Sequence, residues 1–147
     1  MRNNQPVTNV ERSYSDAIAI ISHTDDKGRI TFVNDDFAEI SGYVVDELIG
    51  QPHNILRHPD LPAAAFRDLW ATVKAGRPWA GVVKNRCKNG DHYWVRASVT
   101  PKVDGGYMSV RVRPSREEIS AAEALYARMR REPKLRLREG QLAQARF

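Results

Sequence analysis

The chain has 147 residues, is 41% apolar and carries a net charge of +5 at pH 7. This length and composition predict one folded domain with its own core plus an appendage, and exclude a disordered chain. No apolar run approaches the roughly 18 residues of a membrane span, and the N-terminus lacks a signal pattern, so we expect a cytoplasmic location. The single cysteine, Cys87, excludes an internal disulfide and fits a reducing compartment.

The positive charge is concentrated at the C-terminal end. Residues 115–147 hold eight Lys or Arg and five acidic residues, so they contribute +3 of the total. A basic segment of this kind can meet nucleic acid or an anionic membrane surface. Because the sequence motifs of nucleic-acid binders are absent, we expect a solvated helix and linker and no nucleic-acid partner.

The first elements predict a β-hairpin. Residues 1–16 are polar, and form either a disordered arm or a cap that orders on the domain. Residues 17–24 and 29–33 are typical of strands and flank a turn at 25–28. Asn34 can cap a short helix, because its side-chain oxygen accepts from free amides of the first turn.

The middle of the chain predicts helices. That first short helix stops at Gly42, and a further helical turn follows over residues 44–49. Residues 51–62 contain three prolines and cannot form a long helix or an inner strand. Residues 63–75 form the clearest helix of the domain. Its apolar stripe is Phe66, Leu69, Trp70 and Val73.

A second hairpin is predicted over residues 79–87 and 92–101. Its turn contains Asn89-Gly90, which favours a type I′ turn with positive φ at both residues. Strand alternation puts Asn85 on the same face as Trp79, toward the helices. A last strand covers residues 107–113.

The C-terminal end predicts an exposed helix. Ser115 and Glu118 form a capping box that opens a helix over residues 115–131, and Pro133 ends it. The order of elements predicts an α+β domain: a five-stranded antiparallel sheet with short helices on one face, plus a C-terminal helix.

Several short motifs, weak singly but specific in this order, resemble the PAS sensor-domain family over about residues 15–114. They are Gly28-Arg29-Ile30, Phe32-Val33-Asn34, Ser41-Gly42-Tyr43, Glu47-Leu48-Ile49-Gly50, Lys88-Asn89-Gly90 and Tyr93-Trp94-Val95. A closer resemblance, to the bacterial aerotaxis (redox-taxis) receptor family, rests on longer segments. These include Arg57-His58-Pro59-Asp60, Pro78-Trp79, Lys84-Asn85-Arg86 and residues 89–96.

The resemblance implies a PAS fold that binds FAD non-covalently, whose redox state reports electron transport or oxygen. It implies residues 1–16 as arm or cap, 17–114 as the PAS domain, 115–131 as an output helix and 132–147 as a basic linker. The linker would lead toward a chemoreceptor signalling region and membrane segment that this chain lacks. We expect a homodimer, and no enzymatic activity because no substrate-side base is visible.

The resemblance assigns Arg57, His58, Asp60 and Trp79 to FAD binding. The fork of Arg57 suits the pyrophosphate, and Trp79 suits stacking on a ring system. Asp60 could accept from a ribose hydroxyl or orient His58. The alternative is a surface loop with an Arg57–Asp60 ion pair and Trp79 as core.

Three further residues are cofactor-binding candidates: Asn34, Asn85 and Arg111. Asn85 can bond a flavin carbonyl or ring nitrogen, although it could instead close the turn. Hydrophobicity alone would turn Met108, Val110 and Val112 inward, whereas alignment with light-sensing flavin PAS domains puts Ser109 and Arg111 inward. Arg111 would then lie near the redox-active edge and favour anionic reduced flavin, and the apolar row would become an exposed docking strip.

Two alternatives to a flavin sensor remain open. Four histidines leave a haem-binding gas sensor possible, and a cofactor-free dimerisation module is the other alternative. Cys87 does not occupy the position of the photoreactive cysteine of light-sensing PAS domains, which argues against adduct photochemistry. The sequence contains no metal-ligand cluster, no Ser-His-Asp arrangement and no phosphate-binding Gly-rich loop.

Overall fold

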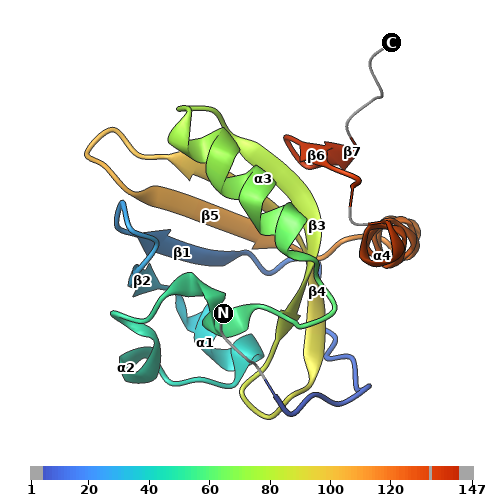
Figure 1. Cartoon of the computed structure of the whole chain (residues 1–147). Coiled ribbons are helices and arrows are strands. Elements are labelled where there is room, and N and C mark those ends of the chain that lie inside the picture. Colours follow the sequence, from blue (N-terminus) through green and yellow to red (C-terminus); the bar gives the residue numbers. More distant parts are fainter. Residues whose placement is uncertain (1–4, 133, 143–147) are drawn as a thin grey trace.

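The computed structural model describes residues 5–132 and 134–142. Its centre is a five-stranded antiparallel sheet in the order β2-β1-β5-β4-β3 (Figure 1). The strands are β1 Ile20–Thr24, β2 Ile30–Val33, β3 Trp79–Arg86, β4 His92–Pro101 and β5 Tyr107–Val112. This confirms the predicted PAS architecture and both predicted hairpins.

The turn between β3 and β4 differs from the prediction. Gly90 has φ 98°, but Asn89 does not have the positive φ that a type I′ turn requires. The Gly90 amide instead donates to the Cys87 carbonyl at 2.9 Å, and the Cys87 amide donates to the Asp91 carbonyl at 2.7 Å. These bonds enclose a three-residue loop that places only glycine in the left-handed region.

One face of the sheet is covered by the helices between β2 and β3. These are α1 Asp35–Ser41, α2 Val45–Leu48, the 3-10 turn η1 His53–Leu56 and α3 Ala63–Lys74. Asn34 caps α1 as predicted, because its Oδ1 accepts from the Phe37 amide at 3.0 Å. In Figure 1, α3 crosses in front of the sheet, so the interior of the domain lies between α3 and the strands.

Helix α4, Arg116–Arg131, packs on the opposite face of the sheet at its β3–β4 edge. The predicted capping box of Ser115 and Glu118 is formed. Tyr126 Oη donates to the Val82 carbonyl at 2.7 Å, and Arg96 of β4 lies 3.3 Å from Glu118. Helix α4 is therefore attached to the two strands farthest from β2.

Segments at both ends of the described chain lie against the domain. The Thr8 amide donates to the Gly90 carbonyl at 2.9 Å, and the Arg12 amide donates to the His92 carbonyl at 2.7 Å. At the other end, part of the predicted linker forms a small hairpin of β6 Leu137–Arg138 and β7 Gln141–Leu142. No helix among residues 5–132 and 134–142 is both long and apolar enough to span a membrane.

Candidate functional site

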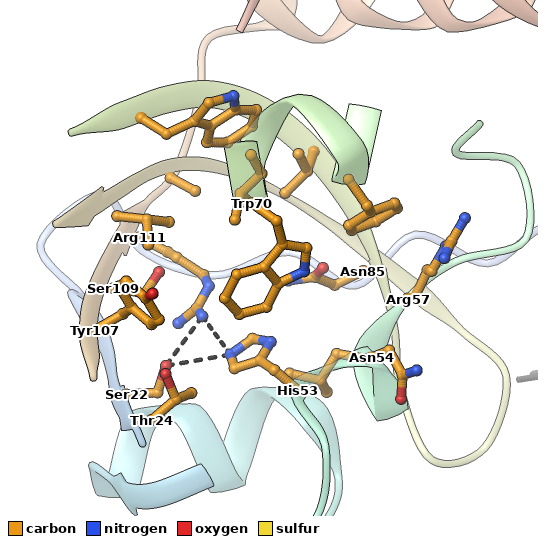
Figure 2. Close-up of a pocket in the computed structure, with 17 residues that line it drawn as sticks. Ser22, Thr24, His53, Asn54, Arg57, Trp70, Asn85, Tyr107, Ser109 and Arg111 are labelled. Carbon is orange, nitrogen blue, oxygen red and sulfur yellow. Dashed lines mark hydrogen bonds between the residues drawn. The ribbon is translucent and has the colours of Figure 1, made fainter. Parts of the chain in front are cut away.

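A cavity of about 100 Å³ lies between the sheet and the α3–η1 side of the domain. Figure 2 shows its lining, to which β1, β3, β4, β5, η1 and α3 all contribute side chains. Because strands turn alternate side chains to opposite faces, each strand presents every second residue to this space.

Strand β3 confirms the predicted alternation. Trp79, Val83 and Asn85 all line the cavity. Trp79 is 1% exposed and Asn85 is 8% exposed, so both face the interior rather than the solvent. The cavity leaves space beside Trp79 that side chains do not fill.

Strand β5 follows the alignment with flavin-binding PAS domains and not its own hydrophobicity. Ser109 and Arg111 are buried and line the cavity. Met108, Val110 and Val112 are half-buried on the other face, so they are less exposed than the strip that was predicted. A buried arginine is costly unless its charge is paired, which marks this position as a site of interest.

Arg111 is the centre of a polar cluster within the cavity. Its Nη2 donates to His53 Nε2 at 2.6 Å and to Ser22 Oγ at 3.0 Å, as the dashed lines of Figure 2 show. Because His53 Nε2 accepts this bond, the proton of the neutral imidazole is on Nδ1. Burial, with a further contribution from Arg111, lowers the pKa of His53 to about 3. Burial lowers the pKa of Arg111 to about 10, so the guanidinium stays charged at neutral pH.

Several polar atoms in the lining have no hydrogen-bond partner in the part of the chain that the structure describes. They are Thr24 Oγ1, Ser109 Oγ and Arg111 Nη1. Nor does any described carboxylate pair with Arg111, whose other close neighbour is the Phe37 ring at 5.4 Å. Buried polar groups are normally hydrogen-bonded. The cavity therefore suits a ligand that brings acceptors and electron density.

The apolar wall of the cavity comes from α3. Phe66, Leu69 and Trp70, which the sequence predicted as a core stripe, line the cavity. In Figure 2 the Trp70 indole stands among the polar groups of the lining, and its ring packs edge-on against Tyr107 at 5.5 Å. The guanidinium of Arg57 lies over the Phe66 ring at 4.2 Å.

The structure brings four of the seven predicted site residues to the cavity: Arg57, Trp79, Asn85 and Arg111. The other three lie outside its lining, and their role toward a cofactor stays a prediction. Asn34 Oδ1 accepts hydrogen bonds from the Phe37 and Ile21 amides, and its Nδ2 donates to the Ala19 carbonyl.

His58 and Asp60 lie in the loop after η1, outside the cavity lining. His58 is 2% exposed and packs against His92, and its Nδ1 accepts from the Asp60 amide at 3.0 Å. The Asp60 carboxylate pairs with Lys84 at 2.9 Å. Lys84 of β3 is thus a cationic partner of Asp60, and the predicted roles of Arg57 and Asp60 toward a cofactor stay predictions.

Sequence reasoning missed several residues of this site, among them Ser22, Thr24, His53 and Trp70. Ser22 and Thr24 carried a readable signal, because they lie two and four residues after Ile20 and so share its buried face of β1. A polar residue at an inward position of a strand needs a partner. His53 had no such local signal, because η1 is too short to show a periodicity.

Among the described residues, His53 is also the only histidine in the cavity lining. Its Nε2 already accepts from Arg111, so in this arrangement it is not free to ligate a haem iron. Within the described residues, no three His, Cys, Asp or Glu side chains gather as a metal site. The geometry therefore gives the haem alternative no support.

The sequence model of the PAS fold matches residues 30–112. This match covers the chain from β2 to β5, the helices on the inner face of the sheet and all of the cavity lining except Ser22 and Thr24 of β1. The chain belongs to the PAS fold family.

Curated relatives narrow this assignment. The aerotaxis receptor of Escherichia coli K12 is 53% identical over 124 residues, which are 82% of this chain and 24% of that receptor. The biofilm dispersion protein BdlA of Pseudomonas aeruginosa is 30% identical over 82 residues, 55% of this chain and 20% of that protein. This chain is a PAS domain of the aerotaxis receptor family, and it spans about a quarter of that receptor's length.

Solved structures confirm the fold. A PAS domain from Colwellia psychrerythraea superimposes with a TM-score of 0.59 at 23% identity, covering 67% of this chain and 89% of that one. A light-oxygen-voltage domain studied with a flavin analogue gives a TM-score of 0.59 at 20% identity, covering 78% of this chain and 87% of that one. The family and the receptor relative also agree with the prediction that this chain is not an enzyme.

Proposed function

We propose that this domain binds FAD in the cavity and senses redox state or oxygen through it for a taxis receptor. The observation that supports this most is the buried Arg111 guanidinium, which lacks a carboxylate partner among the described residues and leaves Nη1 without an acceptor. An uncompensated buried cation is destabilising unless a ligand supplies acceptors or negative charge. The carbonyl and ring-nitrogen edge of an isoalloxazine supplies acceptors, and the anionic reduced form would add negative charge.

The lining residues fit the parts of such a ligand. Phe66, Trp70 and Trp79 provide apolar and aromatic surface for a flat ring system. Asn85 provides a buried amide, and Arg111 a cation, for the polar edge of the ring. Arg57, half-buried over Phe66, provides a guanidinium suited to phosphate oxygens.

The cavity must widen before it can hold a flavin ring. Sites for molecules of this size commonly measure about 300–1,000 Å³, whereas this cavity encloses about 100 Å³. Trp70 is half-buried and stands across the space in Figure 2, so its displacement is the simplest way to admit the ring. We therefore include an outward movement of Trp70 in the proposal.

A bound flavin would supply reversible two-electron chemistry, with a change of charge and hydrogen bonding at the ring edge. On the protein side, Arg111 would bond more strongly to the electron-rich reduced form, and its bonds to His53 and Ser22 would adjust accordingly. A ligand whose two states interact differently with such a cluster shifts the balance between two packings of the domain. In the whole receptor the change would pass to a downstream signalling region, in a homodimer attached to the inner membrane by another segment.

Purification followed by absorption spectroscopy tests this function. We expect bands at about 450 nm that bleach on reduction, and release of FAD rather than FMN on denaturation, identified by mass spectrometry. An intense Soret band would favour the haem alternative. A colourless protein that takes up no added FAD would contradict the proposal and favour the cofactor-free module.

A further inference from the structure

Asp68 of α3 joins the cavity wall to the C-terminal hairpin. Its side chain is buried, with an exposed fraction of 9%. The Trp79 indole Nε1 donates to Asp68 Oδ2 at 2.7 Å. The Gly140 amide donates to the same oxygen at 2.7 Å, and the Glu139 amide donates to Oδ1 at 2.8 Å. One carboxylate therefore accepts three hydrogen bonds from two segments. One segment lies 11 residues after Asp68 in the chain, and the other lies about 71 residues after it.

The hairpin turn is seated closely on β3. Gly140 has φ 88°, and a Cβ at this position would lie 1.8 Å from the Ala80 carbonyl oxygen. Only glycine permits both that conformation and that approach. Leu137 of β6 is 8% exposed, so the hairpin buries an apolar anchor as well. The turn thus lies beside the residue that follows Trp79.

Trp79 has little freedom on its other side. A Cβ at Gly81 would lie 2.5 Å from the Trp79 ring, so the indole packs directly against the β3 backbone. Its ring lines the cavity while its N–H is held by Asp68. A shift of the indole must therefore break or stretch the bond to the oxygen that also holds Gly140.

We infer that Asp68 is a positioning residue that couples the orientation of Trp79 in the cavity wall to the docking of residues 137–142, the segment that follows α4. This inference rests on the proposed function only for the identity of the ligand that moves Trp79. The coupling is reciprocal, as any linkage between two equilibria is: a ligand that favours the present indole position tightens the hairpin, and release of the hairpin loosens the indole. The chain beyond α4 thereby receives a signal directly from the cavity as well as through α4.

The test measures hydrogen exchange of single amide and indole protons by NMR, on the full chain without ligand. Gly140→Ala prevents docking of the turn without touching a cavity residue. We expect it to speed exchange of the Glu139 amide and of the Trp79 indole N–H by about tenfold or more, since each loses protection when the shared carboxylate is freed. Gly105→Ala is the matched control, because Gly105 has φ 90° with no atom within 4 Å of a built Cβ. This control should change neither rate.

The converse variant is Trp79→Phe, which removes the indole N–H and keeps a ring. It identifies the indole signal and should speed exchange at Glu139 and Gly140, again by about tenfold. Asp68→Asn, with a single oxygen for three donors, should release both segments at once. Circular dichroism confirms that each variant is folded. The inference is overturned if Gly140→Ala frees the turn while the Trp79 indole exchanges as in the wild type, or if the turn stays protected in Gly140→Ala.

Added FAD separates this inference from the proposed function. If FAD binds and slows exchange at Glu139 and Gly140 in the wild type but not in Trp79→Phe, both hold. If FAD binds and exchange in the hairpin is unchanged, the coupling to the ligand is wrong and the proposed function stands. If FAD does not bind, the proposed function fails, and the ligand-free exchange rates still decide whether Asp68 couples the two segments.

Discussion

Arg111 Nη2 and His53 Nε2 are joined by a 2.6 Å hydrogen bond inside the cavity, where no described carboxylate balances the guanidinium charge. Burial, with a further contribution from the guanidinium, lowers the pKa of His53 and keeps the imidazole neutral. The bond places the imidazole proton on Nδ1 and holds Arg111 against β1 and η1. This pair is expected to contribute to the pH dependence of folding stability and, under the proposed function, to ligand binding.

Replacement of Arg111 by methionine should weaken FAD binding without lowering the stability of the ligand-free protein. Arg111→Met removes a buried unpaired charge, so we expect the ligand-free protein to be at least as stable as the wild type in urea. The same change should weaken FAD binding by about tenfold or more, and shift the midpoint potential of the bound flavin to more negative values. Isothermal titration and a redox titration measure these quantities.

Arg113→Met is the control for that experiment, because Arg113 follows the same strand, is exposed and pairs with Asp16. It should leave affinity and potential as they are in the wild type. Equal FAD affinity in Arg111→Met and the wild type would show that Arg111 does not contact the ligand.

The stability of the ligand-free domain should fall as the pH falls from about 6.5. The pKa of His53 is lowered to about 3 in the folded state, so the unfolded chain binds the extra proton first. Stability from this group is fully present above the unfolded pKa and is lost progressively below it. Urea unfolding at pH 7.5 and 4.5 should show a loss up to about 3 kcal/mol smaller in His53→Gln than in the wild type.

His58, whose pKa burial lowers to about 4, adds to the same trend in both proteins and cancels in the comparison. His23→Gln, on the outer face of β1 against Phe32, is the matched control for replacing a histidine outside the cavity. If His53→Gln loses as much stability as the wild type between the two pH values, His53 is not neutral in the folded domain.

Loss of the α4 cap should destabilise this helix locally. Ser115 Oγ accepts from the Glu118 amide at 3.0 Å, and this bond is lost in Ser115→Ala. We expect a cost of about 1 kcal/mol in urea unfolding. Ser120→Ala, on the exposed side of the same helix, should have a much smaller effect. Equal costs for the two variants would contradict a capping role.

Gly81→Ala should displace the Trp79 indole. The added Cβ would lie 2.5 Å from the ring, and the ring is held on its other side by α3. We expect a loss of about 1–3 kcal/mol in unfolding free energy and weaker FAD binding. Ser98→Ala, on the exposed face of the neighbouring strand, should change neither. Intrinsic fluorescence and urea unfolding measure both effects, and an unchanged Trp79 environment would refute this packing.

What the sequence determined by itself is the local structure and the family. Strand alternation, the Asn34 and Ser115 caps and the glycine stops depend on neighbours within a few residues, so the elements were predicted close to their observed bounds. The ordered PAS motifs identified the fold, and the alternation of β3 predicted that Trp79 and Asn85 share the interior face.

What only the tertiary structure decided is which side of an alternating strand is inside, and which distant groups meet. Hydrophobicity turned β5 the wrong way, because burial of Arg111 depends on Ser22 and His53, which lie 89 and 58 residues away in the chain. The docking of the C-terminal hairpin on Asp68 spans 71 residues and has no local pattern. Periodicity reports contacts within one element, whereas a cavity and its polar partners arise only when several elements converge.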